Sequence, residues 1–416
     1  MRLLYFAAHQ AWPLTSGNRL RDYHLAQELA KRASVTFVEM CRPGEKPSSP
    51  PSNCRFVEII SLKKGFGYTP GKIFRGLIGP VPLTVLNYTQ SRSAAQLAGL
   101  LARRRFDTVQ IEGVHLSNYL PVIQAAPNRP AILVDWHNIE SELVWQYLEN
   151  TSFWPKRLMA RRTARLLERI EMMMLERWKT HSVVSERERQ KLLSWCPSAH
   201  VNAIPNGVDT HFFSAAQISE IGRNNYAPVS KPSILFVGSM DYHANIEGVT
   251  SFTREIWPEI AEKHPELEFI IVGRHPSPEV RALASERIRV TGTVEDVRPF
   301  YASATAVVVP LRVGSGTRLK ILEAMAAGVP VVSTRLGAEG IDATHGIHLL
   351  LADDRAEMVA AINQIVSSPP IRSRLVLAAR DLVVNHYDWA LIGEELYHIH
   401  CELAQTSVRV PRTSSI

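Results

Sequence analysis

The segment from residue 306 to 328 combines a buried-strand pattern, a glycine turn and a helix-like run. The apolar stretch AVVVPL at 306–311 leads into RVGSGTRLK and then into ILEAMAAG. Glycines leave the backbone bare, so a ligand can approach the N–H groups that open the helix, where anions are bound favourably. This order of strand, turn and helix is typical of an α/β fold with an anion site at the turn.

The turn carries two cations at positions where a helix gains nothing from them. Arg318 and Lys320 lie in the expected first helical turn, and the positive end of the helix dipole disfavours cations there. Bound phosphate would account for both, and Glu323 one turn later can accept hydrogen bonds from sugar hydroxyls. Glycines alone are equally typical of a structural turn. The two cations and the carboxylate together favour phosphate binding.

Strand-like and helix-like runs alternate along most of the chain. At 416 residues the chain suits two domains, and the alternation predicts two parallel sheets, each covered by helices on both faces. Ligands in such doubly wound sheets bind outside the carboxyl ends of the strands. The strands are expected at 3–8, 35–40, 57–60, 108–111, 131–134 and 181–184, then at 234–237, 269–272, 289–291, 306–310, 330–333 and 349–351, with the first helix at 19–32.

Several motifs of the second half resemble one enzyme family, in content and in order. They are PNGVDTHFF, ILFVGSMDYHANIEGV, IIVGRHP, VTGTVEDVRPFY and GSGTRLKILEAMAAGVPVVST. Together they resemble retaining GT-B glycosyltransferases of family four, including the exopolysaccharide-associated sugar transferases. The resemblance implies two Rossmann-like domains facing across a cleft, with a C-terminal helix that crosses back to the first domain.

This resemblance predicts the division of the chain into domains. Residues 1–207 are expected to form the acceptor domain, with 388–404 packing back on it. Residues 208–387 are expected to form the nucleotide-sugar donor domain. The last residues, 405–416, lack an apolar face and are expected to be a flexible tail.

The resemblance also implies a set of donor-binding residues. Two positions depart from the family pattern: Ser315 stands where many members have a glutamate, and Ser239 stands where many have an arginine that meets the diphosphate. Arg318 and Lys320 are therefore expected to supply most of the positive charge. The full donor set is Gly17, Gly238, Ser239, Arg274, Thr293, Val294, Gly314, Ser315, Gly316, Thr317, Arg318, Lys320 and Glu323.

Candidate catalytic residues follow the predicted strands of the first domain. Glu112 and His115 come after the strand at 108–111, and His137 follows the strand at 131–134. A hydrogen-bonded structural role is as compatible with each of them as a catalytic one. In the family that the chain resembles, the leaving phosphate is thought to help deprotonate the acceptor. The chain has no D-x-D triplet, so we expect neither a metal ion nor another cofactor.

A basic amphipathic stretch at 155–178 suggests a further partner. Arginines and lysines share this predicted helix with Leu158, Leu166 and Met173, which suits an anionic membrane surface or, equally, a solvated face over a core stripe. The formal charge of +7 suits phosphates in general, and we expect no nucleic-acid partner. The opening apolar run is short and leads into His9, so we expect a cytoplasmic protein, peripheral on the inner face of a membrane.

These observations predict a retaining, metal-independent glycosyltransferase. It would move a sugar from a nucleoside-diphosphate sugar to a glycan or lipid-linked acceptor in surface polysaccharide or glycolipid biosynthesis. Two alternatives stay open: a nucleotide-sugar epimerase or hydrolase of the same fold, and a non-catalytic module that binds sugar nucleotides.

Overall fold

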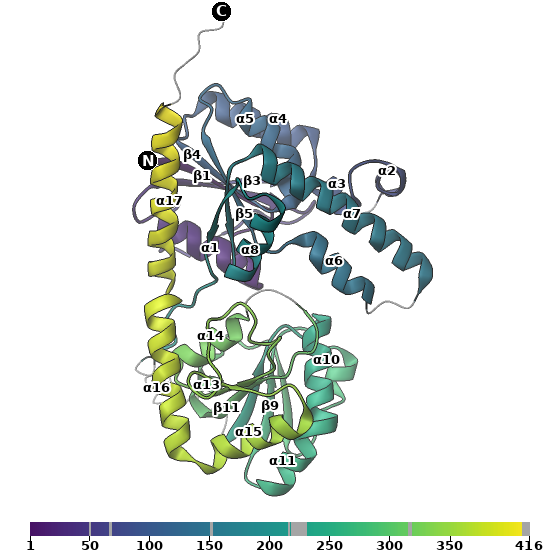
Figure 1. Ribbon diagram of the computed structural model, residues 1–416, viewed down its shortest axis with the longest axis vertical. Helices are drawn as coiled ribbons and strands as arrows, with labels where there is room; N and C mark the ends of the chain where they lie inside the picture. Colours follow the sequence, from purple (N-terminus) through teal and green to yellow (C-terminus); the bar gives the residue numbers. More distant parts are fainter. Residues whose placement is uncertain are drawn as a thin grey trace, which may run out of the picture. The chain divides into compact units, whose positions relative to one another are not determined.

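The computed structural model describes residues 1–49, 51–65, 69–149, 153–214, 217, 231–314 and 318–409 (Figure 1). The chain forms two compact units. One consists of Met1–Pro205 with Ile392–Ile416, and the other of Asn206–Leu391. Ser315, Gly316 and Thr317, three of the predicted donor ligands, lie outside the described residues.

The first unit is built on a sheet of seven strands, all paired in parallel. Their order is β3-β2-β1-β4-β5-β6-β7, so the direction of winding reverses between β1 and β4. The strands are β1 (Arg2–Ala7), β2 (Ser34–Cys41), β3 (Glu58–Lys63), β4 (Thr108–Glu112), β5 (Ala131–Trp136), β6 (Thr180–Val183) and β7 (His200–Ala203).

The second unit repeats this plan with six strands. Their order is β10-β9-β8-β11-β12-β13, again all parallel, with the reversal between β8 and β11. The strands are β8 (Ser233–Val237), β9 (Glu268–Val272), β10 (Ile288–Gly292), β11 (Ala304–Val309), β12 (Val331–Ser333) and β13 (Leu350–Leu351).

Helices lie on both faces of each sheet (Figure 1). In the first unit they are α1 (Gly17–Leu29), α2 (Pro70–Ile78), α3 (Leu83–Tyr88), α4 (Ser91–Arg103), the 3-10 helix η1 (Val114–Tyr119), α5 (Leu120–Gln124), α6 (Glu140–Glu149), α7 (Trp154–Arg177) and α8 (Glu186–Trp195). From residue 243 onward they are α10 (His243–Ser251), the π-helix η2 (Phe252–Ile256), α11 (Trp257–Lys263), α12 (Pro278–Arg281), α13 (Arg298–Ser303), α14 (Leu319–Ala326), α15 (Arg355–Ser367), α16 (Pro369–His386) and α17 (Trp389–Arg409).

The central strands β1 and β11 are largely apolar because both faces of the sheets are covered. All residues of β1 after Arg2 are buried, as are the last four of β11. Such continuous apolar runs are typical of parallel strands between two helical layers, whereas a half-exposed strand alternates. The predicted pair of doubly wound α/β domains is therefore confirmed.

The helix α17 joins the first unit through a buried histidine. His400 is fully buried, with Nδ1 3.1 Å from the Thr108 hydroxyl and Nε2 3.0 Å from Gln110 Oε1. Gly393 lies directly against Glu28 of α1, where a β-carbon would collide with the glutamate side chain. The return of the C-terminal helix to the first unit is thus built into its sequence.

Three local predictions differ from the structure. The short strand β7 was not predicted, because only one of its four residues is buried. The first helix was predicted to begin at residue 19 but begins at Gly17, since the Ser16 side chain accepts a hydrogen bond from the Arg19 N–H and caps the helix there. The helix α17 continues to Arg409, so residues 405–409 are helical rather than part of the predicted flexible tail.

Candidate functional site

Two polar centres lie where the winding of each sheet reverses. In the first unit β1 pairs with β4, with Phe6 opposite Ile111, so the residues that follow both strands meet at one edge. In the second unit β8 pairs with β11 in the same way, with Leu235 opposite Val307. A reversal of this kind opens a crevice at the carboxyl ends of the strands, which is where open α/β sheets bind ligands.

The second-unit centre is a cradle of polar groups around Gly238. The Lys320 Nζ donates to Asn245 Oδ1 at 2.8 Å and lies 4.1 Å from the centroid of the Phe236 ring. The Asn245 amide donates in turn to the Ser239 carbonyl at 2.8 Å. A β-carbon at Gly238 would lie 2.8 Å from Asn245 Nδ2 and 2.9 Å from Lys320 Nζ. Only glycine leaves the room that these two side chains occupy.

The second predicted cation lies at the other strand end of this cradle. Arg318 directly precedes α14 and is only 8% exposed. A β-carbon at Gly314 would lie 3.1 Å from both the Arg318 guanidinium and the Tyr242 hydroxyl, and the φ of Gly314 is 110°. Burial lowers the pKa of Arg318, which expresses the cost of holding this charge without full hydration.

Burial also leaves the Lys320 ammonium only partly protonated at neutral pH in the free protein. Its pKa falls to about 7, first because the ammonium is desolvated and then because of the charge of Arg318, while Glu323 opposes the shift. The pKa of Glu323 is raised by burial, against the opposing effects of Tyr301 and Lys320. Tyr301 donates to Glu323 Oε2 at 2.9 Å and fixes that carboxylate. An anion entering the cradle would favour the charged form of both cations.

Arg274 reaches the same turn from the neighbouring strand end. Its Nε donates to the Ser239 hydroxyl at 2.8 Å, and that hydroxyl donates to Asp241 at 2.5 Å. Arg274 thus places a third positive charge beside Ser239, the serine that replaces the arginine of the family pattern. Thr293 is exposed and Val294 is half-buried, and both follow β10 at the same edge of the sheet.

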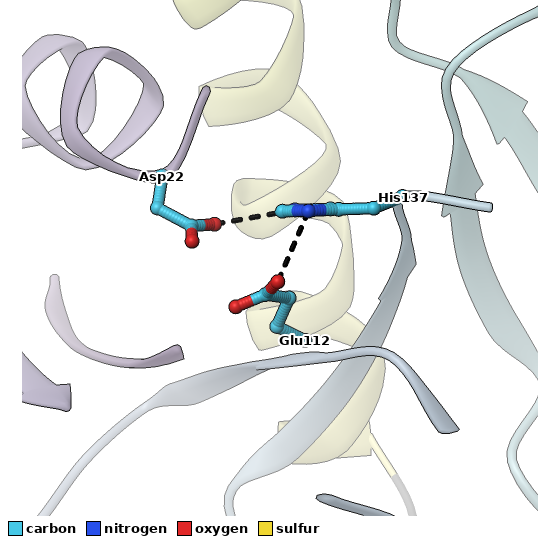
Figure 2. A group of neighbouring side chains, drawn as sticks. All are labelled: Asp22, Glu112 and His137. Atoms are coloured by element: carbon cyan, nitrogen blue, oxygen red, sulfur yellow. Dashed lines mark ion pairs between the residues drawn. The ribbon is translucent and has the colours of Figure 1, made fainter. Parts of the chain in front are cut away.

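The first-unit centre is a histidine between two carboxylates (Figure 2). His137 Nδ1 lies 3.0 Å from Glu112 Oε1, and His137 Nε2 lies 3.2 Å from Asp22 Oδ1. The other oxygen of Glu112 accepts the N–H of Ala8 at 2.6 Å, which ties the ends of β1 and β4 together. The three acidic and basic side chains are each at most 8% exposed.

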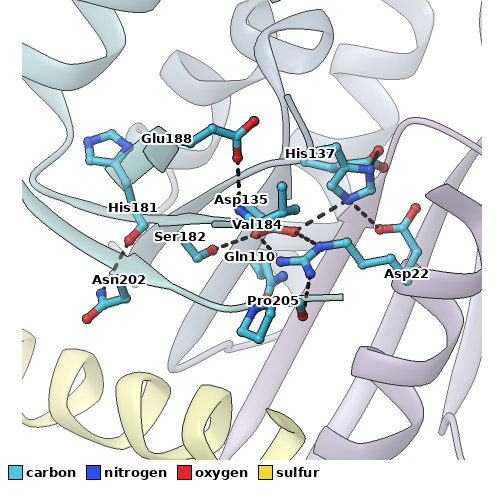
Figure 3. A network of polar contacts seen from close by, with 12 residues as sticks. Asp22, Gln110, Asp135, His137, His181, Ser182, Val184, Glu188, Asn202 and Pro205 are labelled. Atoms are coloured by element: carbon cyan, nitrogen blue, oxygen red, sulfur yellow. Dashed lines mark hydrogen bonds and ion pairs between the residues drawn. The ribbon is translucent and has the colours of Figure 1, made fainter. Parts of the chain in front are cut away.

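A second buried ion pair, between Arg21 and Asp135, lies beside His137 (Figure 3). Arg21 binds Asp135 through two contacts of 3.1 and 3.3 Å and donates to the Pro205 carbonyl at 3.0 Å. Ser182 donates to the same aspartate at 2.7 Å, and His137 Nε2 lies 3.4 Å from it. Burial opposes the charge of Asp135, but Arg21 and His137 hold its pKa well below the usual range.

The carboxylates keep His137 protonated. Burial alone would lower its pKa, but Glu112 and Asp22 raise it well above the ordinary value. Burial would raise the pKa of Glu112, yet His137 and the Ala8 N–H hold it at about 2. The pKa of Asp22 rises to about 7, through burial and the charge of Glu112. The centre therefore holds an imidazolium and an ionised Glu112 at neutral pH.

His115 has the opposite character. Burial, only partly offset by Glu112, lowers its pKa to about 4, so its ring is neutral. It lies on η1 with its ring centroid 5.1 Å from that of Tyr88. Of the three predicted catalytic residues, Glu112 and His137 are in contact, whereas His115 is a neighbour that shares their electrostatic field.

The same centre offers ligand atoms for a metal ion. One atom each from Asp22, Glu112 and His137 lies within 4.8 Å of the others. Both nitrogens of His137 already face carboxylates, so a metal ion bound here would have to displace the proton that the imidazolium carries. A divalent cation would thus compete with a proton for the nitrogens of His137.

Several residues of the two centres were not predicted: Asp22, Arg21, Asp135, Asn245 and Tyr301. Asn245 and Tyr301 fall within motifs that carry the family resemblance, namely ILFVGSMDYHANIEGV and VTGTVEDVRPFY. Arg21 and Asp22 stand in α1, where no local sequence signal distinguishes them from solvated charges.

Comparison with protein-family models gives two matches. Residues 23–212 match the model described as Glycosyltransferase Family 4, and residues 231–368 match the model described as Glycosyl transferases group 1. Among curated proteins, the phosphatidyl-myo-inositol mannosyltransferase of Mycobacterium leprae is 29% identical over 215 residues. That match covers 50% of this chain and 55% of the relative, so the chain spans about half the length of the curated relative.

Solved structures match the fold over nearly the whole chain. Sucrose-phosphate synthase from Thermosynechococcus elongatus has a TM-score of 0.71 at 18% identity, covering 98% of this chain and all (100%) of that one. HepE of Anabaena, solved with UDP-glucose, has a TM-score of 0.64 at 14% identity, covering 97% of this chain and 100% of its own. These likenesses confirm the predicted GT-B fold.

The protonation of Lys320 predicts how diphosphate binding depends on pH. With a pKa near 7 in the free protein, the lysine must take up a proton when an anion binds. We expect the affinity for a nucleoside-diphosphate sugar to fall about 20-fold between pH 6.5 and 8.5. Lys320→Arg keeps its charge and should flatten the profile. Calorimetry in two buffers of different ionisation enthalpy measures both quantities; equal slopes for the two proteins would contradict the assignment.

The charge of His137 predicts the effect of removing Asp22. Asp22→Asn deletes one of the two carboxylates that stabilise the imidazolium, so we expect the pKa of His137 to fall by about one unit or more. Titration of the histidine ring signals by NMR measures this. His181, whose pKa is lowered to about 4 by burial, serves as the internal control and should not move. An unchanged His137 would refute the proposed coupling.

Proposed function

Because this chain belongs to glycosyltransferase family 4, we propose that it is an enzyme that transfers a sugar from a nucleoside-diphosphate sugar to a glycan or lipid-linked acceptor. The observation that carries this proposal is the cradle around Gly238, where Lys320 and Asn245 crowd a bare α-carbon at the reversal of the second sheet. A diphosphate there would meet backbone N–H groups and fixed cations, which stabilise the charge that develops as the glycosidic bond breaks.

In this proposal the second unit binds the donor. Lys320, Arg318 and Arg274 face the diphosphate, and Glu323, held by Tyr301, accepts hydrogen bonds from sugar hydroxyls. Ser315, Gly316 and Thr317 supply N–H groups, and Thr293 and Val294 approach the base. Gly17, the first residue of α1, stays a predicted donor-binding residue.

The first unit binds the acceptor at the His137 centre. An ionised Glu112 can accept a hydrogen bond from an acceptor hydroxyl, and the positive charge of the His137 imidazolium keeps that carboxylate ionised. The imidazolium cannot act as a general base, because both of its ring nitrogens carry protons. His115 is neutral and can exchange hydrogen bonds with the acceptor. We propose that transfer retains the anomeric configuration, with the leaving phosphate taking the acceptor proton.

We propose that the reaction needs neither a metal ion nor another cofactor. The three cations of the second unit already supply the charge that a divalent ion would bring to the diphosphate. The alternative of a nucleotide-sugar epimerase or hydrolase requires the same donor cradle without an acceptor. A non-catalytic binding module requires no functional first-unit centre, whereas that centre contains four buried charged groups in contact, namely Asp22, Glu112, His137 and Asp135.

We place the activity in surface polysaccharide or glycolipid biosynthesis, on the cytoplasmic side of a membrane, without a nucleic-acid partner. Within the described ranges, no helix is both long and apolar enough to cross a bilayer. The stretch predicted at 155–178 forms α7, whose second half packs Leu166 and Leu167 into the core. Its first turns differ, with Trp154 72% and Leu158 65% exposed beside Lys156. These first turns are the part that suits an anionic membrane surface.

The donor cradle predicts a sharp effect of a single methyl group. Gly238→Ala would displace the ends of Asn245 and Lys320, so we expect donor affinity and transfer to fall about 100-fold while the fold is kept. Calorimetry with uridine, guanosine and adenosine diphosphate sugars measures the binding, and an acceptor assay with EDTA measures metal-free transfer. Gly71→Ala is the matched control, since no atom lies within 4 Å of a β-carbon there.

The same experiment separates the competing functions. Donor consumption without any acceptor would favour the epimerase or hydrolase, and donor binding without turnover would favour the binding module. Loss of transfer in EDTA that manganese restores would refute metal independence. Full donor affinity in Gly238→Ala would remove the cradle from the proposal.

The exposed start of α7 predicts binding to anionic vesicles. Replacing Trp154 and Leu158 by serine removes two large apolar side chains, so we expect flotation with phosphatidylglycerol vesicles at low salt to fall about tenfold. Leu377→Ser is the matched control, because this leucine is 71% exposed on α16 of the other unit. Wild-type protein that does not float with these vesicles would end this hypothesis.

A further inference from the structure

Lys64, which follows β3, is a half-buried cation without a carboxylate ion-pair partner among the residues that the structure describes. Its ammonium lies over the ring of Tyr88, 4.4 Å from the centroid. Contact with an aromatic face compensates only part of the hydration that a buried ammonium loses. A site of this kind gains free energy when an anion reaches it.

Other cations surround Lys64. Its pKa is lowered first by burial and then by the charges of Arg42 and Arg19, and only Glu45 acts in the opposite direction. Arg42 follows β2 and Arg19 lies in the first turn of α1, so the segments that follow β1, β2 and β3 bring positive charge to one edge of the sheet. Glu45 is 4.0 Å from Arg42 and offsets one of these charges. The remaining charge is positive, and we call the group of Lys64, Arg42 and Arg19 the positive corner.

This corner adjoins the His137 centre. The ring of Tyr88 lies 5.1 Å from that of His115 and 6.3 Å from that of His9. The pKa values of both histidines respond to Lys64 on one side and to Glu112 on the other, and both are lowered to about 4 by burial. Two neutral imidazoles therefore connect the cations to the groups that we assign to the acceptor.

The helix α2 beside this corner presents an apolar face to solvent. None of its residues is buried, and it carries four large apolar side chains on one side, with exposures of 38% at Ile73, 63% at Phe74, 45% at Leu77 and 67% at Ile78. The opposite side carries Lys72, whose ammonium reaches back to Gly65, next to Lys64; a β-carbon at that glycine would collide with it.

The helix is held in this exposed position by its neighbours. Arg162 of α7 donates to the carbonyl of Gly79, the residue that ends α2, at 2.6 Å. On the other side, a β-carbon at Gly76 would lie 3.0 Å from the β-carbon of Leu83, at the start of α3. An apolar face that is fixed in solvent, next to the positive corner, matches a ligand with an anionic head and a hydrocarbon chain.

We propose that this corner binds a lipid phosphate as the acceptor of the transferase. The phosphate or diphosphate group would lie between Lys64, Lys72 and Arg42, and the hydrocarbon chain would lie along Phe74 and its apolar neighbours on α2. The inference rests on the proposed transfer function and names the acceptor class: an amphiphile with a phosphate ester, whose sugar or hydroxyl end extends past His9 and His115 towards Glu112.

The test measures binding of the intact protein to phosphatidylcholine vesicles that contain dicetyl phosphate. We expect Lys64→Met to weaken this binding about tenfold, and the double change of Phe74 and Ile78 to serine to weaken it at least as much. Lys179→Met, an exposed lysine of the same unit, and Leu377→Ser should bind as the wild type does. Calorimetric affinity for the nucleotide sugar should stay unchanged in all these variants, since it reports the second unit.

One further arm distinguishes a lipid phosphate from free phosphate. Inorganic phosphate should compete weakly, because it lacks the chain that α2 binds. Equal binding of wild type and Lys64→Met to the dicetyl phosphate vesicles would overturn the proposal. If instead donor affinity is absent in the wild type, the transferase assignment fails while the lipid-phosphate measurement still stands.

Discussion

The reversal of winding in each parallel sheet is the constraint on which the functional groups depend. It leaves two adjacent strand ends without a helix crossing between them, so polar residues that follow those strands can meet. In the first sheet it brings Glu112 to the N–H of Ala8, and in the second it brings Gly238 and Gly314 to the two ends of the cradle. The rest of each domain supplies rigidity, because strands buried on both faces cannot shift without exposing apolar surface.

Local patterns were sufficient to predict part of this arrangement. The glycines and cations near the start of α14 stand within ten residues of one another, and cations at a helix start are unusual enough to be informative. The contacts that position them are long-range. Asn245 is 75 residues from Lys320, and Arg21 is 114 residues from Asp135. Nothing near Arg21 distinguishes it from a solvated charge, so only the folded chain identifies its role.

The two departures from the family pattern have different outcomes in the structure. At Ser239, Arg274 from the neighbouring strand end donates to the serine hydroxyl, so positive charge is present at the turn although the residue itself is neutral. Ser315 lies outside the described residues, and its contribution to holding the donor sugar stays a prediction. Compensation between strand ends is available because neighbouring parallel strands finish at the same edge.

The histidine that anchors α17 gives the protein a built-in sensitivity to acid. Burial lowers the pKa of His400 to about 3, so the folded chain keeps it neutral where an unfolded chain would accept a proton. The unfolded state therefore binds more protons below about pH 6.5, and the free energy of unfolding decreases as the solution is acidified from there. Acidification would therefore weaken the attachment of the C-terminal helix at this histidine.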